Sequence, residues 1–258
     1  MAFRTLTVDD NDEIVTLAID RPSVLNALSR QTLTELQRFL TGLTGFRGMI
    51  LTGSGERAFV AGADIREMAA MTPEEGEEFG RLGQEVTRLI EAAPFPVIAC
   101  VNGYALGGGC ELAMACDYIY ATADAVFGQP EVRLGLIPAF GGCVRLQRHV
   151  SPGRAREMIY TGRNVDAGEA LRIGLVNRVF ATREEMLKAA YESLALVSAN
   201  SPIAVALCKE AVNDSRGREI GSALDIEARA FRRTFTSEDM REGTQAFLSK
   251  RRPVFPGK

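Results

Sequence analysis

The spacing of hydrophobic and polar residues divides the chain into an alternating first part and a helical second part. Residues 3–8 and 13–20 alternate apolar and polar side chains around the polar stretch 9–12, which predicts a β-hairpin. Ser29 stands where a helix N-cap would, before leucines at helical spacing. A short buried strand is expected at 49–52. This β-β-α-β order indicates an α/β fold.

Two later segments open from a strand-like run into small residues and then into a helix. In the first, Ala61 leads to Asp64, which could cap a helix at 65–70. In the second, the apolar run 96–101 is followed by three consecutive glycines, 107–109, before a helix-like run at 110–115. Glycine lets the backbone bend sharply and approach a ligand, because it has no Cβ.

The starts of these two helices are candidate anion sites. The first N–H groups of a helix have no intrahelical partner and lie at the positive end of its dipole. One N–H from each segment could hold a single carbonyl oxygen, which is the geometry of an oxyanion hole. The alternative is a glycine turn that packs tightly and binds nothing, because short glycine motifs often match by chance.

Two glutamates stand out as candidate catalytic residues. Glu111 falls in the first turn of the glycine-led helix, and Glu131 follows Pro130 in a loop rich in apolar residues. A carboxylate in such surroundings is unusual unless it takes part in chemistry. For Glu131 the alternative is a structural ion pair with Arg133 or another arginine.

The rest of the chain is expected to be mostly helical toward its end. A long helix begins at Pro73 with several glutamates, which favour the N-terminal end of a helix dipole. Two strands, at 118–121 and 125–127, should precede helices and a further strand, at 152–161, 166–174, 175–180, 183–199, 202–215, 220–235 and 237–250. The composition shift near residue 195 predicts an α/β core at 1–195, which carries the candidate active-site residues, and a helical tail at 196–258. Such tails often pack against another subunit, so 196–258 is expected to be an oligomerisation region.

Composition and charge exclude several classes of function. The 258 residues carry a net charge of −3 and no long basic block, so nucleic acid is not an expected partner. No apolar run reaches the ~20 residues that span a bilayer, and the N-terminus has no signal-peptide pattern, so a cytoplasmic protein without a membrane partner is expected. The single histidine, His149, argues against a catalytic triad or a histidine metal site, and no metal is expected. The five cysteines contain no CxxC pair and predict unpaired thiols in a reducing compartment.

Several motifs in order resemble the crotonase superfamily, and in particular the enoyl-CoA hydratases. They are RPSVLNAL at 21–28, AFVAGADIREM at 58–68, NGYALGGGCELA at 102–113, FGQPE at 127–131, LGLIP at 134–138 and EDMREGTQAF at 238–247. The resemblance covers essentially the whole chain. It implies a spiral of β-β-α units and a C-terminal helical region that makes homotrimers, usually stacked into hexamers.

The resemblance also implies the chemistry. The N–H groups of Ala63 and Gly108 would form the oxyanion hole for the thioester carbonyl of an acyl-CoA, and no separate cofactor is implied. Glu111 would deprotonate water and Glu131 would deliver a proton to C2, so that a 2-enoyl-CoA becomes a 3-hydroxyacyl-CoA, as in fatty-acid or related acyl-CoA degradation. Of these assignments, the division of roles between the two glutamates is the most open.

The expected substrate contacts follow the same motifs. Coenzyme A would lie across 24–27 and 61–66, with Arg66 near its phosphates and Lys250 or Arg251, from a neighbouring subunit, as a further candidate. The full set of substrate-contacting residues is Val24, Ala27, Ala61, Ala63, Asp64, Ile65, Arg66, Gly107, Gly108, Pro130 and Phe140.

One segment departs from the common pattern of the family. In 137–145, Phe140 stands in place of a small residue, and we hypothesise that it narrows the acyl pocket and favours short chains. Two alternative functions remain open: another acyl-CoA enolate reaction such as isomerisation or decarboxylation, and an RNA-binding or assembly role. Having both glutamates argues against the first, and the acidic helix and negative net charge argue against the second.

Overall fold

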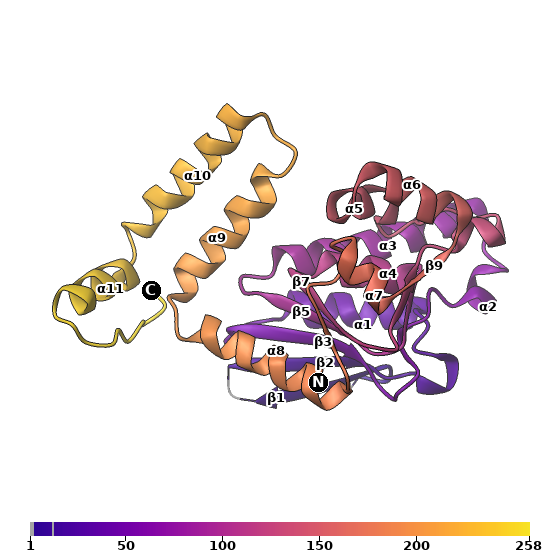
Figure 1. The fold of residues 1–258 in the computed structure, drawn as a ribbon, viewed down its shortest axis with the longest axis horizontal. Coiled ribbons are helices and arrows are strands. Elements are labelled where there is room, and N and C mark those ends of the chain that lie inside the picture. The colour runs from indigo at the N-terminus through magenta and orange to yellow at the C-terminus, as the bar shows by residue number, and fades with distance from the viewer. Residues whose placement is uncertain (1–2, 12) are drawn as a thin grey trace.

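A six-stranded mixed sheet lies at the centre of the molecule, and its strand order is β1-β2-β3-β5-β7-β10 (Figure 1). The computed structural model describes residues 3–11 and 13–258. β1 pairs antiparallel with β2, and every other neighbouring pair is parallel. The strands are β1 (Leu6–Asn11), β2 (Ile14–Ile19), β3 (Gly48–Gly53), β5 (Val97–Val101), β7 (Tyr118–Thr122) and β10 (Arg178–Phe180).

A second, smaller sheet has the order β4-β6-β8-β9. Its strands are β4 (Ala58–Val60), β6 (Tyr104–Leu106), β8 (Val126–Gly128) and β9 (Asn164–Asp166). Three successive passes of the chain each add one strand to the large sheet and then one to the small sheet, β3 with β4, β5 with β6, and β7 with β8. The expected α/β spiral is therefore confirmed.

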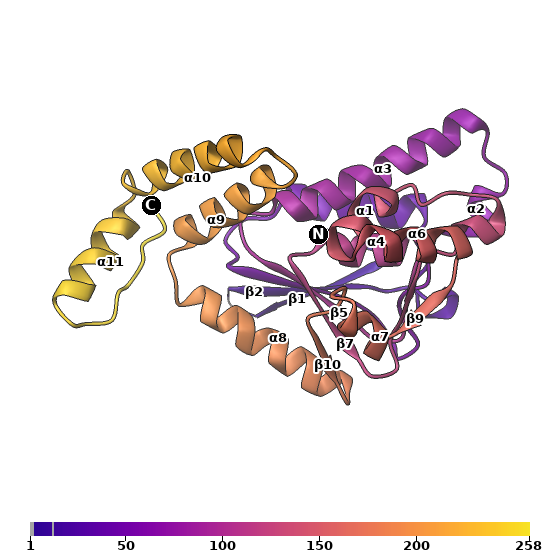
Figure 2. The same cartoon turned by 45° about the horizontal axis from the view of Figure 1, so that its top comes forward.

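Helices cover both faces of the large sheet, as Figure 2 shows. α1 (Arg30–Thr41) and α3 (Pro73–Ala92) pack on one face, and α8 (Arg183–Ser198) packs on the other. The sequence fixes where these helices begin. The Ser29 side chain accepts a hydrogen bond from the Thr32 N–H, and Thr72 forms a reciprocal capping box with Glu75.

Short helices fill the connections around the small sheet, and three helices project from the core at the C-terminus. The short ones are η1 (Pro22–Val24), α2 (Ile65–Met68), α4 (Gly108–Ala115), η2 (Glu131–Leu134), α5 (Gly142–His149), α6 (Pro152–Thr161) and α7 (Ala167–Arg172). The projecting ones are α9 (Pro202–Ser215), α10 (Ile220–Thr234) and α11 (Glu238–Leu248), which lie apart from the sheets in Figure 1. The expected boundary at 195 falls inside α8, whose contacts are with the large sheet.

No single described helix is long and apolar enough to cross a membrane. α8 and α9 together have the length and apolar composition of a membrane span, but they join at a bend of 108°.

Three details of the predicted elements need correction. β1 begins at Leu6 and continues to Asn11, so most of the predicted polar turn is strand, and residue 12 lies outside the described residues. β1 is an edge strand whose residues beyond Leu6 face solvent, and for this reason it carries polar side chains. The run at 96–101 does not lead directly into the glycines, because β6 intervenes. The exit strand predicted at 175–180 is limited to β10.

The cysteines are all unpaired thiols, but not all are core residues. Cys100, Cys110 and Cys116 are buried, whereas Cys143 and Cys208 are exposed. Only the first three of these thiols therefore belong to the core. Spacing along the chain does not reveal which face of α5 or α9 is covered.

Candidate active site

The two segments with small residues meet at one edge of the small sheet. β4 and β6 are adjacent parallel strands, so 61–64 and 107–108 leave the sheet side by side. Glycine is required where they touch: a Cβ on Gly109 would lie 2.0 Å from the Val60 carbonyl oxygen. The sequence could not show this contact, because it depends on strand order.

Two backbone N–H groups at this edge have no partner. Leu28 forms a parallel bridge beside Ala63, in which its own N–H and C=O bond to Gly62 and Asp64 at 2.9 and 2.8 Å. This pattern leaves the Ala63 N–H unused. Gly108 is the first residue of α4, where an N–H has no intrahelical acceptor. Within 3–11 and 13–258, no hydrogen bond uses either group.

Glu111 is held in the first turn of α4 with its carboxylate directed into the same region. One oxygen, Oε1, accepts hydrogen bonds from the N–H groups of Phe140 (2.8 Å) and Gly142 (2.5 Å). The residue is only 1% exposed. Burial raises the pKa of Glu111 to about 8, against the lowering effect of the Gly142 N–H, and the nearby Glu131 carboxyl raises it further.

Glu131 begins the short helix η2 and reaches back toward the glycine turn. Its Oε1 occupies the space beside Gly107, where a Cβ would lie 2.7 Å away, and Gly107 also has a φ of +49°. Its Oε2 is buried without a hydrogen-bond partner. Burial raises the pKa of Glu131 to about 7. No ion pair with Arg133 forms among the described residues, so the structural alternative for this glutamate is not realised.

The two glutamates and both free N–H segments line one cavity of about 140 Å³. Of the predicted substrate-contacting residues, seven line this cavity: Ala61, Ala63, Ile65, Gly107, Gly108, Pro130 and Phe140. Apolar side chains from α2, α3, η2 and the segment after η2 also line its wall: Met68, Phe79, Leu134, Leu136, Ile137 and Ala139. The cavity thus combines an apolar wall with two carboxyl groups and two backbone donors, which is the composition of a small-molecule site.

The remaining four predicted contacts lie outside the cavity. Val24 and Ala27 belong to a loop that runs beside it, tied by the hydrogen bond from the Ala61 N–H to the Leu25 carbonyl (3.0 Å). Asp64 occupies the N-cap position of α2, but the prediction that it caps this helix is wrong. Its carboxylate instead pairs with Arg21 at 3.0 Å.

The candidate phosphate contacts differ in availability. Arg66 is exposed on α2 and forms no ion pair within the described part of the chain. Arg251 is bound by both oxygens of Glu242, at 2.6 and 2.7 Å, and Lys250 lies beside it beyond the end of α11. Arg66 is therefore available to meet an anion, whereas Arg251 is already occupied by Glu242.

Sequence reasoning missed two buried polar residues near Glu111. Gln129 is fully buried, donates weakly to the Gly107 carbonyl (3.5 Å) and leaves its Oε1 without a partner. Arg145 is 7% exposed and bonds to Glu91 and to the Phe140 carbonyl. Both lie in motifs already noted, but nothing in their spacing indicates that the side chains turn inward.

Other candidate groups are structural. The His149 ring contacts the Met114 carbonyl through Nε2 at 3.0 Å, and burial lowers its pKa. Over the described ranges, no three His, Cys, Asp or Glu side chains gather in a way that could hold a metal ion.

Fold and site together define a class: an α/β protein whose cavity combines two buried carboxyl groups with two backbone N–H donors. The family model described as enoyl-CoA hydratase/isomerase matches residues 9–258. The chain is 45% identical over 261 residues to a crotonyl-CoA hydratase from Syntrophomonas wolfei, covering all of both proteins. It is 44% identical over 255 residues to a short-chain-enoyl-CoA hydratase from Clostridium acetobutylicum, covering 98% of this chain and 97% of that protein.

A solved structure agrees with the sequence relatives. The crystal structure of an enoyl-CoA hydratase from Bacillus anthracis superposes with a TM-score of 0.94 at 39% identity, covering 99% of this chain and all of that one. The chain belongs to the enoyl-CoA hydratase/isomerase family.

Proposed function

We propose that this protein is an enoyl-CoA hydratase that adds water across the 2,3 double bond of a short 2-enoyl-CoA. The observation that carries the proposal is the meeting of two buried carboxyl groups and two unpartnered N–H groups in one cavity. Hydration needs a base for water, an acid for C2 and a donor pair for the developing enolate oxygen. The family relationship and the hydratase relatives support it further.

The reaction follows from these positions. The thioester oxygen accepts from the N–H groups of Ala63 and Gly108, which draws electron density toward it and makes C3 electrophilic. Water adds its oxygen to C3 and gives a proton to Glu111, while Glu131 gives its proton to C2. The product is a 3-hydroxyacyl-CoA, and the proton on Glu111 must return to Glu131 before the next turnover.

The hydrogen bonds support this division of roles. From the order of their pKa values alone, Glu111 would be the acid and Glu131 the base. The contacts favour the opposite assignment: two N–H groups donate to Oε1 of Glu111 and stabilise its ionised form, whereas Oε2 of Glu131 is buried without a hydrogen-bond partner among the described residues. We therefore propose that the reactive state carries its charge on Glu111 and its proton on Glu131.

The size of the cavity supports a short acyl chain. Phe140 is 3% exposed, and its ring packs 5.5 Å from that of Phe79 against Gly108. Phe140 lines the cavity, and we infer that its ring limits the length of the acyl chain. The curated relatives include a crotonyl-CoA and a short-chain-enoyl-CoA hydratase.

We further infer a homotrimer or homohexamer in a reducing compartment, the cytoplasm. Large apolar side chains project from the C-terminal helices, and Phe231, Phe247 and Leu248 are 64%, 83% and 80% exposed. Exposed apolar surface on this scale indicates an interaction site. The unpaired cysteines support the compartment.

Hydration of crotonyl-CoA tests the function. Wild-type protein should remove the absorbance of the conjugated thioester and form a 3-hydroxyacyl-CoA, identified by its mass. Isomerisation of a 3-enoyl-CoA without hydration of the 2-enoyl-CoA would contradict the proposal.

A further inference from the structure

The loop that holds Glu111 is itself held through one carbonyl group. The N–H groups of Phe140 and Gly142 converge on Oε1 of Glu111 only in one orientation of the intervening peptides. The Phe140 carbonyl fixes that orientation, because it accepts from NH1 of Arg145 (2.9 Å). The Thr87 hydroxyl lies 3.1 Å from the same carbonyl oxygen and shares its one proton with the closer Gln84 carbonyl (2.8 Å). Arg145 is thus the main donor that holds the backbone between residues 140 and 142, and Thr87 is the weaker one.

Arg145 is locked in turn by Glu91. Its Nε and NH2 donate to the two oxygens of Glu91 at 2.8 and 2.7 Å, the bidentate form that fixes both distance and orientation. Gly141 leaves room for the Arg145 guanidinium group. It adopts a φ of +115°, and a Cβ there would lie 2.0 Å from NH1 of Arg145. The guanidinium group therefore lies against the very loop that presents the donors.

One face of α3 supplies the support. Gly83, Thr87 and Glu91 are four residues apart and so lie along one stripe of the helix. Gly83 makes room for the ring of Phe140, since a Cβ there would lie 2.1 Å from that ring. Asn213 of α9 donates to the Glu91 carbonyl at 3.1 Å and holds the end of α3.

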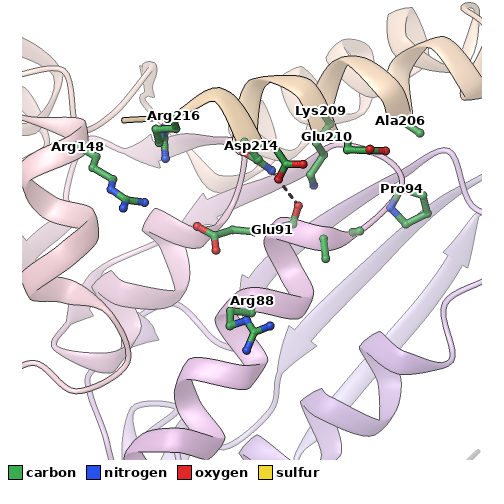
Figure 3. A pocket seen from close by; sticks show the side chains of 12 residues that line it. Arg88, Glu91, Pro94, Arg148, Ala206, Lys209, Glu210, Asp214 and Arg216 are labelled. Carbon is green, nitrogen blue, oxygen red and sulfur yellow. Dashed lines mark hydrogen bonds between the residues drawn. The ribbon is translucent and has the colours of Figure 1, made fainter. Parts of the chain in front are cut away.

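We propose that the Glu91–Arg145 ion pair, with Thr87, is a positioning element for Glu111. It sets the two backbone donors on Oε1, so that Oε2 alone meets water at C3. Glu91 and Arg145 do not line the active-site cavity; Glu91 borders a separate one, beside Arg88 and Arg148 in Figure 3. They act on Glu111 indirectly, through the loop at residues 140–142. The inference rests on the proposed function for its kinetic test only.

The charged groups around Glu111 decide in which direction its pKa should shift when the loop is loosened. Glu131 of η2 raises its pKa, and Arg145 of α5 lowers it. Two thiols also face it, Cys110 on its own helix and Cys143 on α5. The N–H donors stabilise the ionised form, so a loosened loop raises the pKa of Glu111. The acid limb of the kcat/KM profile then moves to higher pH, because the base must be ionised.

Glu91→Gln separates positioning from charge. By charge alone, losing the carboxylate at position 91 leaves Arg145 uncompensated and moves the acid limb to lower pH. By positioning, the loop loosens and the limb rises. Arg145→Lys keeps the positive charge but loses the bidentate hydrogen bonds to Glu91. Thr87→Val removes the hydroxyl donor with little change in side-chain shape. We expect all three variants to move the acid limb upward by up to about 1 pH unit. We also expect kcat for crotonyl-CoA to fall by up to about 10²-fold, with KM nearly unchanged.

The control is Arg81→Gln, which breaks an exposed ion pair with Glu77 on the solvent side of the same helix. It should leave both kcat and the pH profile unchanged. An acid limb that stays in place in all three variants, or that falls in Glu91→Gln, overturns the proposal. Infrared titration of the Glu111 carboxyl, as a difference between wild type and Glu111→Gln in each background, reads the same pKa without substrate. An unshifted carboxyl overturns the proposal even if the wild type hydrates no enoyl-CoA.

Discussion

At the residue scale, the site is built from side chains whose environment differs from what their type suggests. Glu111 is a carboxyl group with almost no exposure, and only two backbone donors and a distant arginine oppose the cost of its charge. Gly107, Gly108 and Gly109 each have a packing reason to lack a Cβ, against Glu131, Phe140 and Val60 respectively. Tight packing and a free N–H group thus coexist at Gly108. The packing and binding interpretations of the glycine turn are not exclusive.

The buried charge of Glu111 makes stability depend on pH. Its folded pKa lies above the unfolded value of 4.5, so it contributes stability that is complete below pH 4.5 and lost as pH rises through about 8. Glu111→Gln removes this titration and keeps an oxygen for the Phe140 and Gly142 donors. In urea unfolding at pH 5, 7 and 9, the free energy of unfolding of the variant should increase relative to that of the wild type as pH rises, by up to a few kcal/mol. Glu131 titrates in the same direction in both proteins. A difference in unfolding free energy that stays constant with pH would contradict the assignment of a buried, proton-binding Glu111.

Several residues could be named from the sequence because their roles depend on local order. Glu111 and Glu131 follow a glycine turn and a proline within apolar stretches, and both lie in the cavity. Arg145 could not be assigned from the sequence, because its partner Glu91 is distant along the chain. Gln129 could not be assigned either, because nothing in the residue pattern shows that its side chain is buried. The Arg145 and Glu91 side chains are 54 residues apart in sequence. Asp64 was misassigned as a cap because Arg21, its actual partner, is 43 residues away.

At the element scale, helices were predictable and strand order was not. Caps and apolar spacing located the C-terminal helices α8 to α11 to within a residue or two at most ends. The short strand β6 was missed, since three residues in a glycine-rich stretch give no periodic signal. The pairing of β4 with β6, which brings the oxyanion segments together, depends on the spiral of the whole chain.

Under the proposed function, the contact between α3 and the loop after η2 would set the depth of the acyl pocket. Phe140 is wedged between Gly83 and Phe79 of α3, so its ring cannot swing away without displacing the helix. Wild type should therefore prefer crotonyl-CoA over 2-decenoyl-CoA in kcat/KM. Phe140→Leu should narrow that preference by about tenfold, because each methylene accommodated is worth about 1 kcal/mol or more. Equal efficiency of the wild type on both substrates would contradict the role of Phe140 in chain-length selection.

At the scale of the whole molecule, α9 to α11 form an arm with little core of its own. The groove between α9 and α10 is lined by apolar residues, with Leu224 and Phe231 on its rim, 54% and 64% exposed. A single chain leaves this surface in water, and a second copy would cover it.

Light scattering tests the assembly. The wild type should have the mass of three or six chains, and Phe231→Glu should lower it, because a charge in an apolar interface stays without a partner. Tyr160→Glu changes another residue with 71% exposure on α6 and serves as the control, with no change in mass expected. A monomeric wild type at micromolar concentration would contradict the oligomer.

The central claim is that Glu111 and Glu131 divide the hydration reaction between water and C2. Exchange of the C2 proton of butyryl-CoA in D₂O tests it most directly, because this saturated substrate requires only the acid–base group at C2. We predict that Glu111→Gln and Glu131→Gln each lower crotonyl-CoA hydration by about 10²–10⁴-fold. Only Glu131→Gln should also abolish the exchange. Exchange that survives in Glu131→Gln and disappears in Glu111→Gln would reverse the roles, and hydration that persists in either variant would contradict the two-carboxyl mechanism.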